Sequence, residues 1–98
     1  METYQDLKGF EDIYEISINY PYKIRYKKNK TSVRDHINHK GDVYVYLNRV
    51  HYFKDIIIAN HFIDNPNKLP CIEHINHNKE DNRIDNLRWI SQQENCEK

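Results

Sequence analysis

The stretch CIEHINHNKEDNRIDNLRWISQQEN, residues 71–95, constrains this chain more than any other part of it. In it the carboxylate of Glu73 directly precedes the imidazole of His74, and Asn86 and Asn95 follow His74 by twelve and twenty-one residues. A general base, an oxygen ligand for a hard metal and a neutral amide ligand are the groups that metal-assisted phosphodiester hydrolysis uses. The spacing therefore points to one compact site built from this segment.

Asparagine is common here, at 12 of 98 residues, so a single offset from a histidine reaches an asparagine about one time in eight. The chain contains its own control, because HINH occurs twice, at residues 36–39 and 74–77, each time after an acidic residue. The first copy has Asn48 at the shorter offset but Ile57 at the longer one. Only the second copy satisfies both offsets, which favours it as the functional one.

The second copy and its flanks resemble the HNH endonucleases, particularly the phage and intron-encoded homing type, whose core reads roughly HxDGNxxNNxxxNLxW. Residues 74–89 read HINHNKEDNRIDNLRW. The preceding ANHFIDNPNKLP is similar to the family's AxxFIPNPxxKP, and LKGFEDIYEIS at residues 7–17 resembles an associated N-terminal module with a GYExxYxVS core. The resemblance thus covers nearly the whole chain.

The resemblance implies an α+β fold in which residues 1–53 form a small antiparallel β region that binds DNA. Residues 54–98 would form a ββα-metal (HNH, His-Me finger) nuclease core, with both parts in one compact unit. In that core a strand, a long loop, a second strand and a helix would surround one metal ion.

The roles of four residues follow from the resemblance and the chemistry. His74 would be the general base, since an imidazole titrates near neutral pH. Asn86 would shape the loop whose backbone orients the His74 ring. Glu73 and Asn95 would hold one Mg²⁺ or Mn²⁺, an ion that keeps several waters and needs few protein ligands. The expected partner is double-stranded DNA.

Several departures from the family pattern leave alternatives open. Glu73 is longer than the more usual Asp, Asn76-His77 replaces Asp-Gly, and only three residues follow Asn95. The C-terminal helix-turn-helix that homing enzymes of this type often carry is therefore not expected. The chain could therefore be a minimal nuclease of low specificity, an obligate homodimer or a degenerate relic. The alternatives to an enzyme are a catalytically impaired DNA-binding module and a viral interaction protein.

The net charge of zero conceals a separation of charge along the chain. Residues 1–20 carry a net −4, residues 21–54 carry +7, and residues 55–98 carry −3. DNA binders gain affinity by neutralising phosphates, so the basic middle is the expected backbone contact, although a solvated basic loop has the same composition. The residues expected to contact DNA are Lys23, Arg25, Lys27, Lys28, Lys30 and Arg34, with Arg83 and Arg88 as candidate phosphate clamps.

Periodicity predicts the N-terminal elements. Apolar and polar residues alternate over residues 12–19 and 20–26, which predicts two strands around Pro21, whereas residues 27–42 are polar and predict a loop. Residues 43–47 and 50–53 predict a hairpin across Asn48-Arg49, although Asn-Gly is the favoured pair at such a turn. Apolar residues at helical spacing predict a helix over residues 54–62.

The C-terminal third is expected to contain strands at residues 71–75 and 87–90. Ser91 and Glu94 form a capping-box pattern that predicts the start of a final helix. Side chains alternate along a strand, so Glu73 and His74 should face opposite sides unless a bulge or twist re-aims one of them.

Other features exclude some classes of protein. The longest apolar run is residues 56–59, which predicts no membrane span, and the N-terminus lacks a signal-peptide core. Cys71 and Cys96 form no CxxC pair, and the histidines lack zinc-ligand spacing. Abundant Asn, Ile, Lys and Tyr suggest an AT-rich genome, as of a phage or large DNA virus. The expected location is therefore intracellular, in the host cytoplasm or nucleus.

Overall fold

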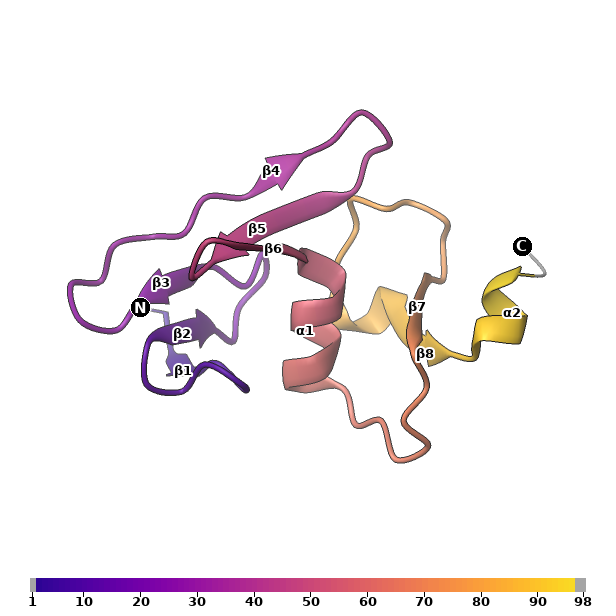
Figure 1. The fold of residues 1–98 in the computed structure, drawn as a ribbon, viewed down its shortest axis with the longest axis horizontal. Helices are drawn as coiled ribbons and strands as arrows, with labels where there is room; N and C mark the ends of the chain where they lie inside the picture. Colours follow the sequence, from indigo (N-terminus) through magenta and orange to yellow (C-terminus); the bar gives the residue numbers. More distant parts are fainter. Residues whose placement is uncertain (1, 97–98) are drawn as a thin grey trace.

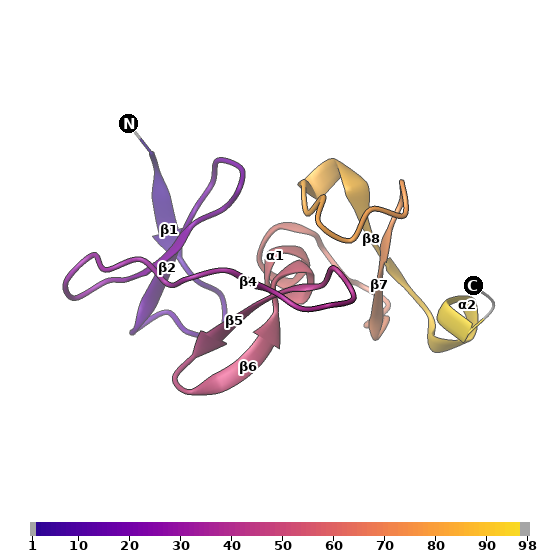
Figure 2. The same ribbon diagram turned by 90° about the horizontal axis from the view of Figure 1, so that it is seen from above.

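The α+β fold predicted from the sequence is confirmed by the computed structural model, which describes residues 2–96 (Figure 1). Two three-stranded antiparallel sheets lie at one end of an elongated molecule and a β-hairpin with a short helix at the other. The helix α1 (Lys54–Phe62) lies between them (Figures 1 and 2). The principal extents are 44 × 32 × 27 Å.

The first sheet has the order β1 (Tyr4–Asp6), β2 (Tyr14–Ser17), β3 (Ile24–Tyr26). All four residues of β2 are buried, because this central strand is covered on both faces. The strand predicted at residues 12–19 is thus present but shorter. The one predicted at residues 20–26 is confined to its second half, since residues 20–22 form a turn and Pro21 has no amide hydrogen to donate to a ladder.

The second sheet has the order β4 (His36–Ile37), β5 (Val43–Leu47), β6 (Val50–Phe53). The β5–β6 hairpin has the predicted bounds. Its turn places Asn48 at φ 51° and Arg49 at φ 67°, the two positive values that a tight hairpin turn requires. The loop prediction for residues 27–42 was wrong at β4, which pairs His36 with Tyr44 across the sheet.

The helix α1 has the predicted bounds and joins the two ends of the molecule through one core. Ile57, Ile58 and Ala59 are buried on it. The core cluster around them includes Val45 of the second sheet and Leu87 of the C-terminal hairpin. Residues from both predicted regions, 1–53 and 54–98, therefore share this core, and their separation into domains stays a prediction.

The C-terminal hairpin pairs β7 (Cys71–His74) with β8 (Leu87–Ile90), and a 3₁₀ turn, η1 (Ile84–Asn86), precedes β8. The strand β8 has its predicted bounds, and β7 ends one residue earlier than expected. The final helix, α2 (Gln92–Cys96), begins with the predicted capping box. Ser91 Oγ accepts from the Glu94 amide at 3.0 Å, and Glu94 Oε1 accepts from the Ser91 amide at 3.1 Å. No described helix combines the length and apolar character needed to cross a membrane.

Candidate functional site

The register of the β7–β8 hairpin decides where Glu73 and His74 point. Every residue of β7 pairs with one residue of β8, with Glu73 opposite Arg88 and His74 opposite Leu87. The strand therefore contains no bulge, and neighbouring side chains project to opposite faces. Of the two devices considered for re-aiming one side chain, a bulge or a twist, the bulge is absent from the described hairpin. Glu73 and His74 consequently have different surroundings.

His74 is held inside the molecule, with 10% of its side chain exposed. Its Nε2 lies 2.7 Å from Oδ1 of Asn82, a residue that is itself only 6% exposed. On the same nitrogen, Oδ2 of Asp55 lies 3.9 Å away. The contact that orients the ring is thus made by a side chain of the loop between β7 and β8. The resemblance had implied a backbone group in this role.

Asp55 was not predicted from the sequence. It lies in the first turn of α1, where an acidic residue ordinarily needs no explanation beyond the helix dipole. Here burial raises the pKa of its carboxyl, while the nearby His74 acts in the opposite direction and lowers it. A half-buried carboxylate that lines a pocket beside an imidazole is a recurrent feature of functional sites. Only the tertiary fold, which packs α1 against β7, reveals this pair.

Asn86 fixes the loop that follows His74. Its Nδ2 donates to the Asp81 carbonyl at 2.8 Å and to Asn76 Oδ1 at 2.9 Å, and its Oδ1 accepts from the Asn76 amide at 3.0 Å. The loop begins with a turn in which His77 adopts φ 65°, at the position where the family pattern has glycine. The loop is therefore closed without glycine by the contacts of one buried asparagine, in the arrangement of a positioning residue.

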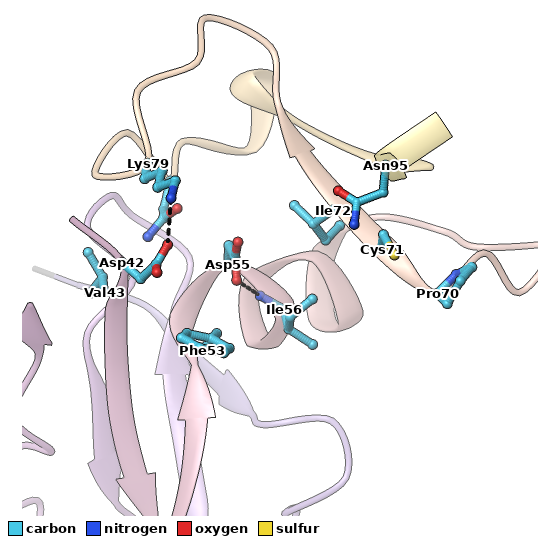
Figure 3. A pocket seen from close by; sticks show the side chains of 11 residues that line it. Asp42, Val43, Phe53, Asp55, Ile56, Pro70, Cys71, Ile72, Lys79 and Asn95 are labelled. Carbon is cyan, nitrogen blue, oxygen red and sulfur yellow. Dashed lines mark hydrogen bonds and ion pairs between the residues drawn. The ribbon is translucent and has the colours of Figure 1, made fainter. Parts of the chain in front are cut away.

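Glu73 is on the other face of the hairpin. Its carboxylate contacts the guanidinium of Arg88, which also lies 3.8 Å from Glu94 at the start of α2. Asn95 of α2 lines a pocket of about 440 Å³ together with Asp55, Asn82 and residues at the start of β7 (Figure 3). Glu73 is not among the residues that line this pocket. The structure thus brings His74 and Asn86 to one end of the hairpin. Asn95 shares a pocket with Asp55 and Asn82, the two side chains that contact His74, whereas Glu73 does not line that pocket.

The predicted metal ligands fit a hard divalent cation by their chemistry. A carboxylate oxygen and an amide oxygen suit Mg²⁺, whereas the ion pair with Arg88 would have to open for Glu73 to bind it. Among residues 2–96, no three His, Cys, Asp or Glu side chains are grouped to bind a metal. A two-ligand Mg²⁺ site does not need such a group, because water and substrate oxygens complete the shell.

The cations predicted to contact DNA divide into two sets. Arg25 and Lys30 pair with Glu15, Lys27 pairs with Asp6, Arg83 pairs with Asp81, and Arg88 pairs with Glu73. Lys23, Lys28 and Arg34 are exposed, and no ion pair with another described side chain is seen for them. Lys23, Lys28 and Arg34 can therefore contact a phosphate without first leaving an ion pair among the described residues, whereas the paired cations, some of them also exposed, cannot.

Comparison with known proteins agrees with this geometry. Residues 68–96 match the family described as HNH endonuclease. The uncharacterized HNH endonuclease L245 of Acanthamoeba polyphaga mimivirus is 41% identical over 39 residues, which are 40% of this chain and 12% of that protein. A structure titled "DNA binding and cleavage by the HNH homing endonuclease I-HmuI" superposes with a TM-score of 0.76 at 24% identity, over 97% of this chain and 56% of that one.

The family implied by the sequence resemblance is thus matched over residues 68–96, and the fold is similar to that of the solved HNH homing endonuclease. The chain spans about one eighth of the viral relative and just over half of the solved chain. The residues in the family match include His74, Asn82, Asn86 and Asn95, whereas Asp55 lies outside it.

Proposed function

We propose, from this family and fold, that the chain is a metal-dependent endonuclease that hydrolyses phosphodiester bonds of duplex DNA. The observation that carries the proposal is the placement of His74. Its ring is largely enclosed, one ring nitrogen contacts Asn82, which lines a pocket, and the surrounding loop is fixed by Asn86. An imidazole whose one nitrogen is held leaves the other to act as a base.

In the proposed reaction His74 takes a proton from a water molecule, and the resulting hydroxide attacks the scissile phosphorus. Asn86 keeps the loop closed, so that the ring does not rotate away from the water. When bound at Glu73 and Asn95, Mg²⁺ or Mn²⁺ would supply charge stabilisation for the phosphate and the leaving 3′ oxygen. Lys23, Lys28 and Arg34 would contact the DNA backbone away from the reacting phosphate.

The test is a plasmid-nicking time course with wild type and His74→Ala, in Mg²⁺ and in EDTA. A well-placed general base contributes about 10²–10⁴ in rate, so the variant should lose nicking by that factor. It should keep its circular dichroism spectrum and its affinity for duplex DNA. The matched control is His77→Ala, since His77 is exposed in the same loop. A folded His74→Ala protein that nicks within about threefold of wild type would remove His74 from this role.

A second candidate function is favoured by one observation, the contact of Arg88 with the predicted metal ligand Glu73. A carboxylate retained by an arginine binds a metal ion less well, so the same fold could bind DNA without cleaving it. A mobility shift of duplex DNA by wild type, with no nicking in Mg²⁺ or Mn²⁺, would select this alternative. Absence of both activities would instead point to an interaction protein.

A further inference from the structure

Two oxygen atoms from different parts of the chain face the same nitrogen of His74. Oδ1 of Asn82, from the loop between β7 and β8, lies 2.7 Å from Nε2. Oδ2 of Asp55, from the first turn of α1, lies 3.9 Å from it. The three side chains are largely enclosed, with exposed fractions of 10% for His74 and 22% for Asp55. An imidazole in such a setting has a defined tautomer.

The contact with Asn82 assigns the proton to Nε2, because an amide oxygen at 2.7 Å accepts a hydrogen bond and the nitrogen must donate it. The Asp55 oxygen, at 3.9 Å, is too far for a hydrogen bond and acts on the same nitrogen through its charge. If the Asn82 amide were reversed, its NH₂ would donate to a lone pair on Nε2. That lone pair would then also face the Asp55 carboxylate, which repels it. The Nε2–H tautomer satisfies the Asn82 oxygen and turns a positive hydrogen toward the Asp55 carboxylate, and it leaves the lone pair on Nδ1.

We propose that Asn82 and Asp55 are positioning residues, which hold His74 with its proton on Nε2 and so make Nδ1 the atom that acts as base. The inference rests on the proposed function in taking His74 as the general base. It adds two residues to which neither the spacing analysis nor the comparisons assign a role. Neither residue touches substrate in this scheme, because both act through the imidazole.

The proton and electron pairs balance in this arrangement. Nδ1 accepts a proton from water as the water oxygen forms its bond to phosphorus. The bond from phosphorus to the 3′ oxygen breaks, and its electron pair stays on that oxygen, which takes a proton from solvent. His74 is then an imidazolium, and the Asp55 carboxylate beside Nε2–H stabilises its positive charge. Release of the Nδ1 proton to solvent restores the neutral ring.

Each positioning residue is itself fixed by the fold. Asn82 directly follows Asp81, whose carbonyl accepts from the Asn86 side chain at 2.8 Å, so Asn86 acts on His74 through this segment of the loop. Asp55 is fixed by its own Oδ1, which accepts from the Ile56 amide at 2.7 Å at the start of α1. Two elements that are distant in sequence therefore converge on one nitrogen.

The first experiment reads the tautomer directly and needs no enzyme activity. Long-range ¹H–¹⁵N correlation spectra of the full chain, recorded at alkaline pH where the ring is neutral, distinguish the two tautomers, and a His74→Gln sample identifies the His74 signals. Wild type should show Nε2–H. In Asn82→Leu, which removes the acceptor at similar volume, the spectrum should change to a mixture of tautomers. The matched control is Asn60→Leu, at an exposed position of α1. Nδ1–H in wild type would overturn the proposal without any variant.

The second experiment measures nicking by the same proteins and by Asp55→Asn. Loss of a residue that orients a catalytic imidazole typically costs about 10- to 100-fold, and the loss should appear in kcat with KM nearly unchanged. Asn82→Asp, which keeps an oxygen acceptor, should restore most of the rate. An unchanged tautomer and rate in folded Asn82→Leu would reject the positioning role. A different outcome is possible, in which wild type shows the expected tautomer, Asn82→Leu changes it as expected, and wild type does not nick DNA. That outcome would reject the proposed nuclease function and would keep the explanation of how the His74 ring is oriented.

Discussion

His74 and Asn86 could be found from the sequence because their spacing is a property of one short segment. The side chains that contact His74 could not be identified from the sequence. Asn82 lies in that segment without a predicted role, and Asp55 is nineteen residues before His74, on a helix whose acidic first turn has an ordinary explanation. The orientation of Glu73 could not be predicted from the spacing of the motif either. It depends on the register of the hairpin, which places Glu73 opposite Arg88, on the other face from His74.

The same burial that makes Asp55 useful beside His74 should destabilise the fold. Burial raises the pKa of this carboxyl, so the folded protein binds the proton more tightly than the unfolded chain does. The stability that this group contributes is therefore fully present below the ordinary Asp pKa and is lost as the pH rises through the raised value. Asp55→Asn should accordingly be more stable than wild type at neutral pH, and the difference should vanish in acid.

Urea unfolding of wild type and Asp55→Asn, at neutral pH and below about pH 4, measures this difference. Asp12→Asn is the matched control, since Asp12 is exposed and should show no comparable pH-dependent gain. A variant that is stabilised and yet nicks more slowly would show the usual conflict between stability and function at a site. Equal stability of the two proteins at neutral pH would mean that the burial of Asp55 has no net penalty.

At the scale of elements, those with a local signal were predicted well. The β5–β6 hairpin, α1 and β8 have their predicted bounds, and the capping box of Ser91 and Glu94 forms as expected. The strand β4 was missed, because its two residues lie in a polar stretch and are too few to show an alternation of apolar and polar side chains. The strand β7 contains no bulge. A bulge or twist was considered only because one site was assumed to need both Glu73 and His74 on one face.

The turn of the β5–β6 hairpin offers a test of local strain. Arg49 has φ 67°, a region that costs a residue with a Cβ about 1–2 kcal/mol. Arg49→Gly should therefore stabilise the protein, by up to about 1 kcal/mol, since glycine also loses more chain entropy on folding. The free energy of urea unfolding is the measurement. Arg49→Ala is the control, because it removes the charge and retains the Cβ; an equal gain from both would assign the effect to charge instead of backbone.

At the scale of the whole molecule, the exposed cations Lys28 and Arg34 and the proposed catalytic site at His74 lie at opposite ends. The loop between β3 and β4, which carries Lys28 and Arg34, extends from one end of the long axis, and the β7–β8 hairpin with His74 is at the other (Figure 1). With a long axis of 44 Å, one duplex could contact both only by lying along it. At about 3.4 Å per base pair, such a duplex would be covered over roughly 13 base pairs.

This arrangement predicts which cations determine the salt dependence of DNA binding. Lys28 and Arg34 are exposed, whereas Lys27 and Lys30 are engaged by Asp6 and Glu15 within the first sheet. Each phosphate contact contributes about −0.9 to the slope of log K against log salt concentration. Replacing Lys28 and Arg34 together by Gln should therefore make the slope shallower by nearly two, weaken binding at low salt, and leave the fold unchanged.

The control has to remove the same charge from elsewhere on the surface. Lys8→Gln with Lys68→Gln does so, because both lysines are exposed and lie outside the basic segment of residues 21–54. Both double variants have the same net charge, so a slope that falls equally in the two would reflect only the overall field of the protein. A slope that falls only in the Lys28 and Arg34 variant would place the phosphate backbone along that loop. If the slope of log K against log salt concentration were unchanged in the Lys28 and Arg34 variant, the β3–β4 loop would be excluded from the DNA interface. DNA would then be bound near His74 and Asn95 without a contribution from that loop.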